Sequence, residues 1–295
     1  MWIDAHSHIW APDTNRFPLA PGKTREDLRP PSFTDDELMA VARAENVGRV
    51  VLIQHSIYHR FDTASLLDAV SRRPDTFRAI GMVDDRAPTP GATMRRLLPL
   101  GVTGVRITPF IHANDPAGWL DTPGMREMWE TAAETRQAIC CLIFAEHLPA
   151  VRAMCERYPD TPVVIDHLAR IGADGHTRET DVEQLCRLAR YEHVCVKVSA
   201  FYTLGAKAPP YLDLVPLIRR VFDAFGPRRL MWGSDCPYQL AAGHGYAESI
   251  SLVRDRLDFL SSEDVAWLLG GTAERVFFAS RLEGENSLPR GGNLG

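Results

Sequence analysis

The chain has 295 residues, of which 45% are hydrophobic and 24% charged, so it is long enough for one large α/β barrel or two ordinary domains. The formal net charge of -5 is spread without long runs of either sign, which argues against nucleic acid as the main partner. The sequence contains no apolar run of about 18 residues, so we expect no membrane span.

The six cysteines form no CxxC pair and mostly lie in apolar runs, which is typical of reduced thiols in a cytoplasmic protein. The first expected strand begins at residue 2, which leaves no room for a signal peptide. We therefore expect a cytoplasmic location.

In residues 3–9, apolar or small side chains alternate with the polar side chains of Asp4, His6 and His8, and a repeat of two residues is the period of a β-strand. Residues two apart in a strand point to the same side, so we expect His6 and His8 side by side, with Asp4 one step deeper in the same row. Two imidazoles aimed into one cavity can hold a metal ion, or can polarise a carbonyl as hydrogen-bond donors. Because such a pair also arises by coincidence, its weight depends on the rest of the chain.

An irregular segment of residues 11–33 follows, and a loop this long inside a compact domain is usually functional. After it, apolar runs alternate with helical segments. We expect strands at 49–54, 77–83, 103–108, 138–144, 162–167, 193–199 and 229–233, and helices at 34–45, 63–72, 90–100, 123–136, 147–158, 178–190, 211–225 and 246–259. Two short helices follow, the first capped by Ser262, and the tail from residue 284 is expected to be disordered.

Eight strand–helix cycles predict a single (β/α)8 barrel over residues 1–283, with 284–295 as a tail. The continuous apolar strands are typical of a parallel sheet that helices cover on the outside. A doubly wound open sheet is the alternative, but no glycine-rich phosphate loop follows the first strand.

Polar side chains gather at the carboxyl ends of the expected strands, where barrels carry their active sites. In strand order they are His6 and His8; Gln54, His55 and Ser56, with Tyr58 and His59; Arg106 and Thr108, with His112; Asp166 and His167, with Arg170; Lys197, Ser199 and Tyr202; and Ser234 and Asp235. Independent coincidences would scatter such residues over both ends of the barrel. Their convergence on one rim therefore indicates a functional site.

Each of these residues also has a structural interpretation. His167 could be a core histidine bonded to the backbone, and Asp235 could cap the turn before Pro237. Arg106 could form a structural ion pair. We favour catalysis for the first two residues and substrate binding for Arg106.

Lys197 lies in the inward row of the seventh strand, where a buried lysine needs a partner such as Asp4. Its role is left open between structure and substrate binding. His147, at the start of a helix, is interpreted as a surface residue. No role is assigned to His55, His59 and His112.

Four segments resemble the amidohydrolase superfamily: residues 4–10 (DAHSHIW), 164–168 (VIDHL), 196–199 (VKVS) and 232–237 (WGSDCP). Within it, the chain is similar to the branch of lactone hydrolases typified by 2-pyrone-4,6-dicarboxylate lactonase, fuconolactonase and sulfomuconolactonase. The resemblance runs from residue 2 to about residue 280. It implies a (β/α)8 barrel with His6, His8, His167 and Asp235 in the active centre.

Two departures from the superfamily pattern concern metal. Binuclear members use a carboxylated lysine or a glutamate from the fourth strand, where this chain has Arg106 and Thr108, so a two-metal site is not expected. Metal-dependent members usually take a further histidine from the fifth strand, and residues 139–144 contain none. Some members of the lactonase branch work without metal and others hold one zinc. A single zinc or other divalent ion on His6, His8 and Asp235, and a metal-independent site, therefore both stay open.

The resemblance and the rim residues together predict hydrolysis of a small carboxylated or sugar-acid lactone. Asp235 would be the general base that activates water, and His6, His8 and His167 would polarise the carbonyl directly or through one divalent ion. The residues expected to bind the substrate, mostly through its carboxylate, are Arg106, Arg170, Tyr202, Lys197, Ser199 and Tyr58.

A zinc-dependent non-oxidative decarboxylase of an aromatic or unsaturated carboxylic acid ranks second, because such enzymes normally need the missing histidine of the fifth strand. A non-catalytic barrel ranks third, since desolvated histidines and arginines cost stability that an inert scaffold has no reason to carry. We expect a small-molecule substrate and no nucleic-acid or membrane partner, and assembly into a homo-oligomer is a further expectation.

Overall fold

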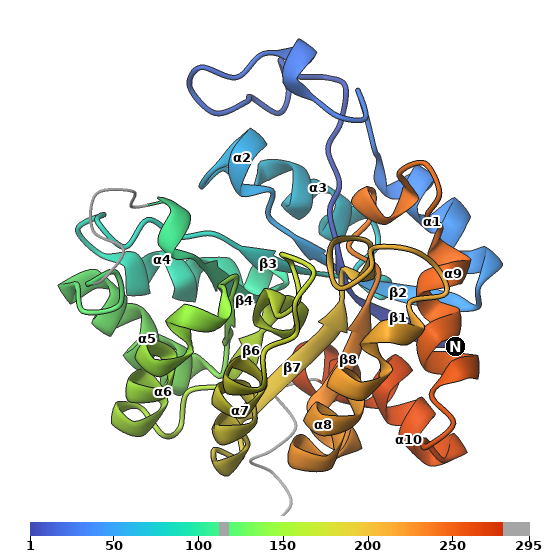
Figure 1. Cartoon of the computed structure of the whole chain (residues 1–295). Coiled ribbons are helices and arrows are strands. Elements are labelled where there is room, and N and C mark those ends of the chain that lie inside the picture. The colour runs from blue at the N-terminus through green and yellow to red at the C-terminus, as the bar shows by residue number, and fades with distance from the viewer. Residues whose placement is uncertain (112–117, 280–295) are drawn as a thin grey trace, which may run out of the picture.

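The computed structural model describes residues 1–111 and 118–279, in which eight parallel strands form one sheet in sequence order (Figure 1). The strands are β1 (Trp2–Ser7), β2 (Val47–Ile53), β3 (Phe77–Gly81), β4 (Val102–Ile107), β5 (Ala138–Cys141), β6 (Val163–Ile165), β7 (Val194–Ser199) and β8 (Leu230–Gly233). The α-helices are α1 (Asp35–Ala44), α2 (Ser56–His59), α3 (Ala64–Arg72), α4 (Pro90–Leu97), α5 (Pro123–Thr135), α6 (Leu148–Arg157), α7 (Glu179–Arg187), α8 (Val215–Phe225), α9 (Tyr246–Ser251) and α10 (Ser262–Ala266).

The sheet closes on itself between β8 and β1. The N–H of Asp235 donates to the carbonyl oxygen of His6 at 2.7 Å, and the N–H of His8 donates to that of Cys236 at 2.8 Å. Gly233 allows this approach, because a Cβ at that position would lie 2.6 Å from the Cβ of His6. The predicted single (β/α)8 barrel is confirmed.

Alternation along the strands divides the core into two parts. One set of apolar side chains, including Ile3, Val51 and Ile80, fills the barrel interior together with Phe277 and Phe278 from the end of the described chain. The opposite set packs against the surrounding helices. The interior is therefore closed at its amino end, and chemistry is confined to the carboxyl end.

The predicted alternation of β1 is wrong at one point. The pairing with β2 shifts register between Asp4 and Ser7, which is the mark of a bulge. The Asp4 carboxylate consequently contacts Ser7, Ser234 and Tyr246, and it does not share the row of His6. The cap of α10 is also one residue earlier than predicted: Ser261, not Ser262, accepts the Asp264 N–H.

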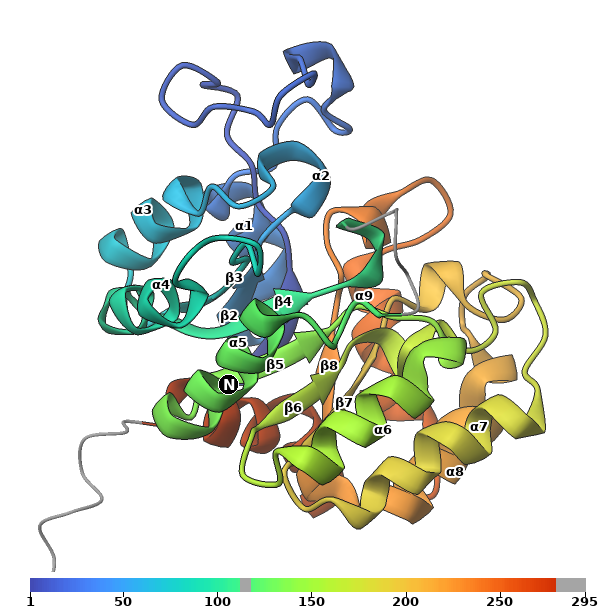
Figure 2. The ribbon, with the colours of Figure 1, turned by 90° about the vertical axis from the view of Figure 1, so that its left-hand side faces the viewer.

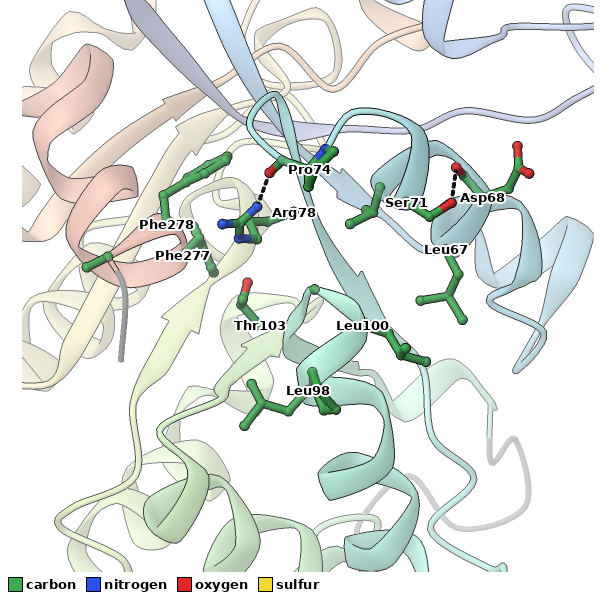
Figure 3. A pocket seen from close by; sticks show the side chains of 14 residues that line it. Leu67, Asp68, Ser71, Pro74, Arg78, Leu98, Leu100, Thr103, Phe277 and Phe278 are labelled. Atoms are coloured by element: carbon green, nitrogen blue, oxygen red, sulfur yellow. Dashed lines mark hydrogen bonds between the residues drawn. The ribbon is translucent and has the colours of Figure 1, made fainter. Parts of the chain in front are cut away.

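Residues 11–33 and α2 stand at the same end of the barrel in both views (Figures 1 and 2), while α10 lies toward the opposite end. A cavity of about 860 Å³ opens near the chain's last described residues, lined by apolar groups such as Leu98 and Phe278 (Figure 3). This cavity contains none of the predicted site residues. No helix in the described ranges is long and apolar enough to cross a membrane. His112 and the predicted tail 284–295 lie outside the described residues.

Candidate active site

Four predicted residues meet at the carboxyl end of the barrel, around the carboxylate of Asp235. Its Oδ1 lies 3.4 Å from Nε2 of His6 and 3.2 Å from Nε2 of His8. Its Oδ2 lies 3.9 Å from Nε2 of His167. All four side chains are almost fully buried, so their mutual interactions are little screened by water. The residues come from both sides of the β8–β1 seam and from the segment after β6.

A left-handed turn follows β6. His167, Leu168, Ala169 and Arg170 have φ angles of 55°, 53°, 53° and 54°. Left-handed backbone costs about 1–2 kcal/mol per residue for side chains other than glycine, and such strain gathers at functional sites. In a turn with three residues per turn, positions three apart share a face. The turn therefore presents His167 and Arg170 to the same side.

A buried trio of charged side chains lies next to His6 and consists of Asp166, Lys197 and Arg106. Asp166 Oδ1 is 3.0 Å from Lys197 Nζ, and Asp166 Oδ2 accepts a hydrogen bond from Arg106 Nη2 at 3.0 Å. Burial would raise the pKa of Asp166, but Lys197, His6 and Arg106 outweigh it and hold this pKa well below the usual range. The partner of Lys197 is thus Asp166, and the predicted pairing with Asp4 is wrong, because Asp4 faces away at the bulge. The sequence showed Asp166 on the rim but gave it no role.

The protonation of His6 follows from its neighbours. Burial, with Lys197 next to it, lowers its pKa well below the usual value, so the ring is neutral at pH 7. Arg106 Nη2 lies 2.7 Å from Nε2, and a guanidinium can only donate. Lys197 Nζ, which also can only donate, lies 3.2 Å from Nδ1, so each ring nitrogen of neutral His6 faces a cation and the ring can accept a hydrogen bond from only one of them.

His8 indicates that the centre needs one more positive charge. Its Nδ1 lies 2.9 Å from the carbonyl oxygen of Ile53, which can only accept, so Nδ1 carries a hydrogen. Nε2 then faces Asp235 Oδ1 at 3.2 Å. Two bare acceptors at that distance would repel each other. This pair of atoms is therefore suited to hold a cation.

The donor set fits one divalent metal ion. Among the described residues, His6, His167 and Asp235 offer ligand atoms within 4.8 Å of one another, all of them buried. His8 adjoins the same carboxylate. Imidazole nitrogens with one carboxylate suit zinc. His167 thus joins the set of His6, His8 and Asp235 that the sequence suggested, and Nε2 of His6 also lies 2.7 Å from Arg106 Nη2.

Asp235 is held as a charged carboxylate. Burial alone would raise its pKa, but His167, His8 and His6 more than offset this and depress the pKa below the ordinary range. The Tyr202 hydroxyl donates to Oδ2 at 2.8 Å. Burial raises the pKa of Tyr202, and the nearby Asp235 charge adds to that effect, so the tyrosine keeps its proton.

The remaining predicted residues take various places around this centre. Ser199 Oγ lies 2.8 Å from His167 Nδ1. The Tyr58 hydroxyl accepts the Arg29 N–H at 3.1 Å. Arg170 packs over the Phe144 ring at 5.4 Å. His147, predicted to be a surface residue, has a side chain only 11% exposed and packs edge-on against Phe110 and Trp119.

Two residues next to the centre were not recognised as a pair from the sequence. His55 Nε2 and the Tyr238 hydroxyl form a short hydrogen bond, although the residues are 183 positions apart. The Tyr238 ring lies 5.9 Å from that of His8. The sequence places His55 on the rim. The sequence feature that points to its partner is the tyrosine that directly follows Pro237.

Comparisons with known proteins show the family to which this barrel belongs. The Amidohydrolase family model matches residues 3–279. The L-fucono-1,5-lactonase of Burkholderia ambifaria is 30% identical over 96% of this chain and 97% of its own. The 4-sulfomuconolactone hydrolase of Hydrogenophaga intermedia is 28% identical over 88% of this chain and 83% of its own.

A solved structure of an amidohydrolase from Burkholderia multivorans with bound zinc superposes with a TM-score of 0.77 at 25% identity, covering 94% of this chain and 99% of that one. The predicted resemblance to the superfamily, and to lactone hydrolases within it, is confirmed. The chain belongs to the amidohydrolase family.

Proposed function

We propose that the protein hydrolyses the ester bond of a small lactone that carries a carboxylate or sugar-acid group. The two relatives named as lactone hydrolases support the reaction class. The observation that carries the proposal is the ring of His6, His8 and His167 around a single carboxylate at 3.2–3.9 Å. A general base beside several carbonyl-polarising groups is what ester hydrolysis requires.

Asp235 acts as the general base. Its depressed pKa keeps it charged at neutral pH, and the hydrogen bond from Tyr202 fixes Oδ2 in place. The carboxylate takes a proton from the attacking water as the carbon–oxygen bond forms. It later delivers that proton to the ring oxygen that leaves, so the base is regenerated.

The imidazoles stabilise the oxyanion. Nδ1 of His8 is committed to the Ile53 carbonyl, so only its Nε2 can face the substrate. Ser199 holds His167 through Nδ1 in the same way, which leaves Nε2 of His167 toward Asp235. One divalent ion held by His8, His167 and Asp235, with His6, would supply Lewis-acid polarisation of the carbonyl.

Arg170 and Arg106 bind the substrate carboxylate. The Nε atoms of both are buried and have no hydrogen-bond partner among the described residues, and an unmet buried donor costs about 1–3 kcal/mol. Arg170 has no carboxylate partner in the described ranges, whereas Arg106 is partly neutralised by Asp166. Arg170 is therefore the main anchor. Tyr202 supports the site by its hydrogen bond to Asp235, and Ser199 by its contact with His167. Lys197 supports it as the partner of Asp166, and Tyr58 by stacking on His55.

The test is ring opening of a lactone panel before and after treatment of the protein with a chelator, with metal content measured on the same samples. L-fucono-1,5-lactone, a carboxylated butenolide and a neutral lactone of similar size make up the panel. We expect ring opening of at least one acidic or sugar-acid lactone. Release of carbon dioxide from an aromatic acid with no lactone opened would contradict the proposal. A cytoplasmic location and assembly into a homo-oligomer stay predictions.

A further inference from the structure

The hydrogen-bond direction between His55 and Tyr238 is fixed by the backbone. The Tyr58 N–H donates to His55 Nδ1 at 3.1 Å, so Nδ1 carries no hydrogen. The hydrogen of the imidazole must then be on Nε2, which faces the Tyr238 hydroxyl. His55 therefore donates and the oxygen of Tyr238 accepts. The Tyr58 ring stacks on His55 at 4.0 Å and 22°, which holds the imidazole in this orientation.

The hydroxyl hydrogen of Tyr238 is consequently free to point away from His55. The Tyr238 ring lies 5.9 Å from that of His8, whose Nε2 is 3.2 Å from Asp235 Oδ1, so this phenol borders the centre of the site. The Tyr238 ring also lies 6.4 Å from that of Tyr202, at 26°, beside the hydroxyl that holds the base.

We propose that Tyr238 is a further substrate-contacting residue and that His55 is its positioning residue. The inference rests on the proposed lactone hydrolysis. Tyr238 donates a hydrogen bond to the ring oxygen of the lactone, which gains negative charge as its bond to the acyl carbon breaks. Asp235 returns the proton to that oxygen, and Tyr238 keeps its own. An O–H donor aimed where charge develops contributes to kcat more than to KM.

The test is a double-mutant cycle on the best lactone of the panel. We expect Tyr238→Phe to lower kcat by about 10-fold or more with KM within about 3-fold. His55→Ala should lower kcat to a similar extent, and the double variant should be no worse than Tyr238→Phe alone. His55→Gln can still present an N–H at the Nε2 position, so it should retain most of the activity.

Tyr191→Phe is the matched control, since it also removes a tyrosine hydroxyl, in a bond to the exposed side chain of Glu156. It should leave kcat unchanged. Losses that multiply in the double variant, or full activity of Tyr238→Phe, would overturn the inference.

A measurement that does not need activity separates this inference from the proposed function. In 15N-labelled protein, the ring of His55 should be neutral with its hydrogen on Nε2, and this resonance should shift in Tyr238→Phe. A hydrogen on Nδ1 would overturn the inference even if lactones are opened. If no lactone is opened and the resonance behaves as expected, the proposed function fails while the pairing of His55 with Tyr238 stands.

Discussion

The backbone N–H of Asp235 donates to the carbonyl oxygen of His6 at 2.7 Å, across the seam between β8 and β1. The side chains of the same two residues meet at 3.4 Å, between Oδ1 and Nε2. One contact thus closes the barrel, and the other assembles the candidate catalytic pair. Changes at this seam should therefore affect stability and activity together.

Substitution Gly233→Ala tests this coupling. The new Cβ would lie 2.6 Å from the Cβ of His6 and 3.0 Å from its backbone nitrogen, and backbone cannot easily give way. We expect a loss of about 1–3 kcal/mol in the free energy of unfolding, with kcat falling as His6 moves. Gly270→Ala is the control, because nothing lies within 4 Å of its Cβ. Wild-type denaturation and turnover in Gly233→Ala would refute the coupling.

The buried trio predicts an order of stabilities. Asp166→Asn removes the carboxylate that Lys197 and Arg106 share, which leaves two buried cations without a counter-charge. Removing one side of a buried pair typically costs about 3–5 kcal/mol. Lys197→Met should cost less, because Asp166 keeps its bond to Arg106. Urea denaturation of both variants checks the order, and a more stable Asp166→Asn would be inconsistent with it.

The strand order and the rim of the barrel could be predicted from apolar runs and from the residues at their ends. What failed depended on backbone irregularity or on long-range pairing. Strict alternation put Asp4 in line with His6, whereas the bulge turns it toward Tyr246. That error also assigned Lys197 the wrong partner, whereas Asp166 follows the neighbouring strand β6 and lies directly beside it. The left-handed turn at 167–170 has no glycine to signal it.

Stability should fall as the pH drops below about 6.5. Burial lowers the pKa of His167 to about 4 from its ordinary 6.5, so between these values the unfolded chain binds a proton that the folded protein does not. Its contribution is fully present above pH 6.5 and is lost as the pH falls toward 4, by up to roughly 3 kcal/mol.

Urea denaturation of chelator-treated protein at pH 7 and pH 5 measures this loss. His167→Gln should show a weaker pH dependence, and His176→Gln, at an exposed position, should match the wild type. An equal pH dependence in His167→Gln and in the wild type would show that His167 is not the cause.

Arg170→Met should separate binding from chemistry. Loss of the guanidinium removes charge-assisted contacts to the substrate carboxylate, each of about 1.5–3 kcal/mol, so KM should rise about 10-fold or more while kcat changes little. The stacking on Phe144 is partly kept by the methionine stem. A neutral lactone should show no such rise. An equal rise for charged and neutral lactones would indicate a general distortion of the site.

The most direct measurement is the turnover number of Asp235→Asn on the best lactone, beside the wild type and with the unfolding midpoint of both. The asparagine keeps the shape and the hydrogen bond from Tyr202 but cannot take a proton from water. Loss of a general base typically costs about 100-fold or more, and we predict a loss of that size with the fold intact. Turnover within a few-fold of the wild type would contradict the assignment of Asp235 as the base.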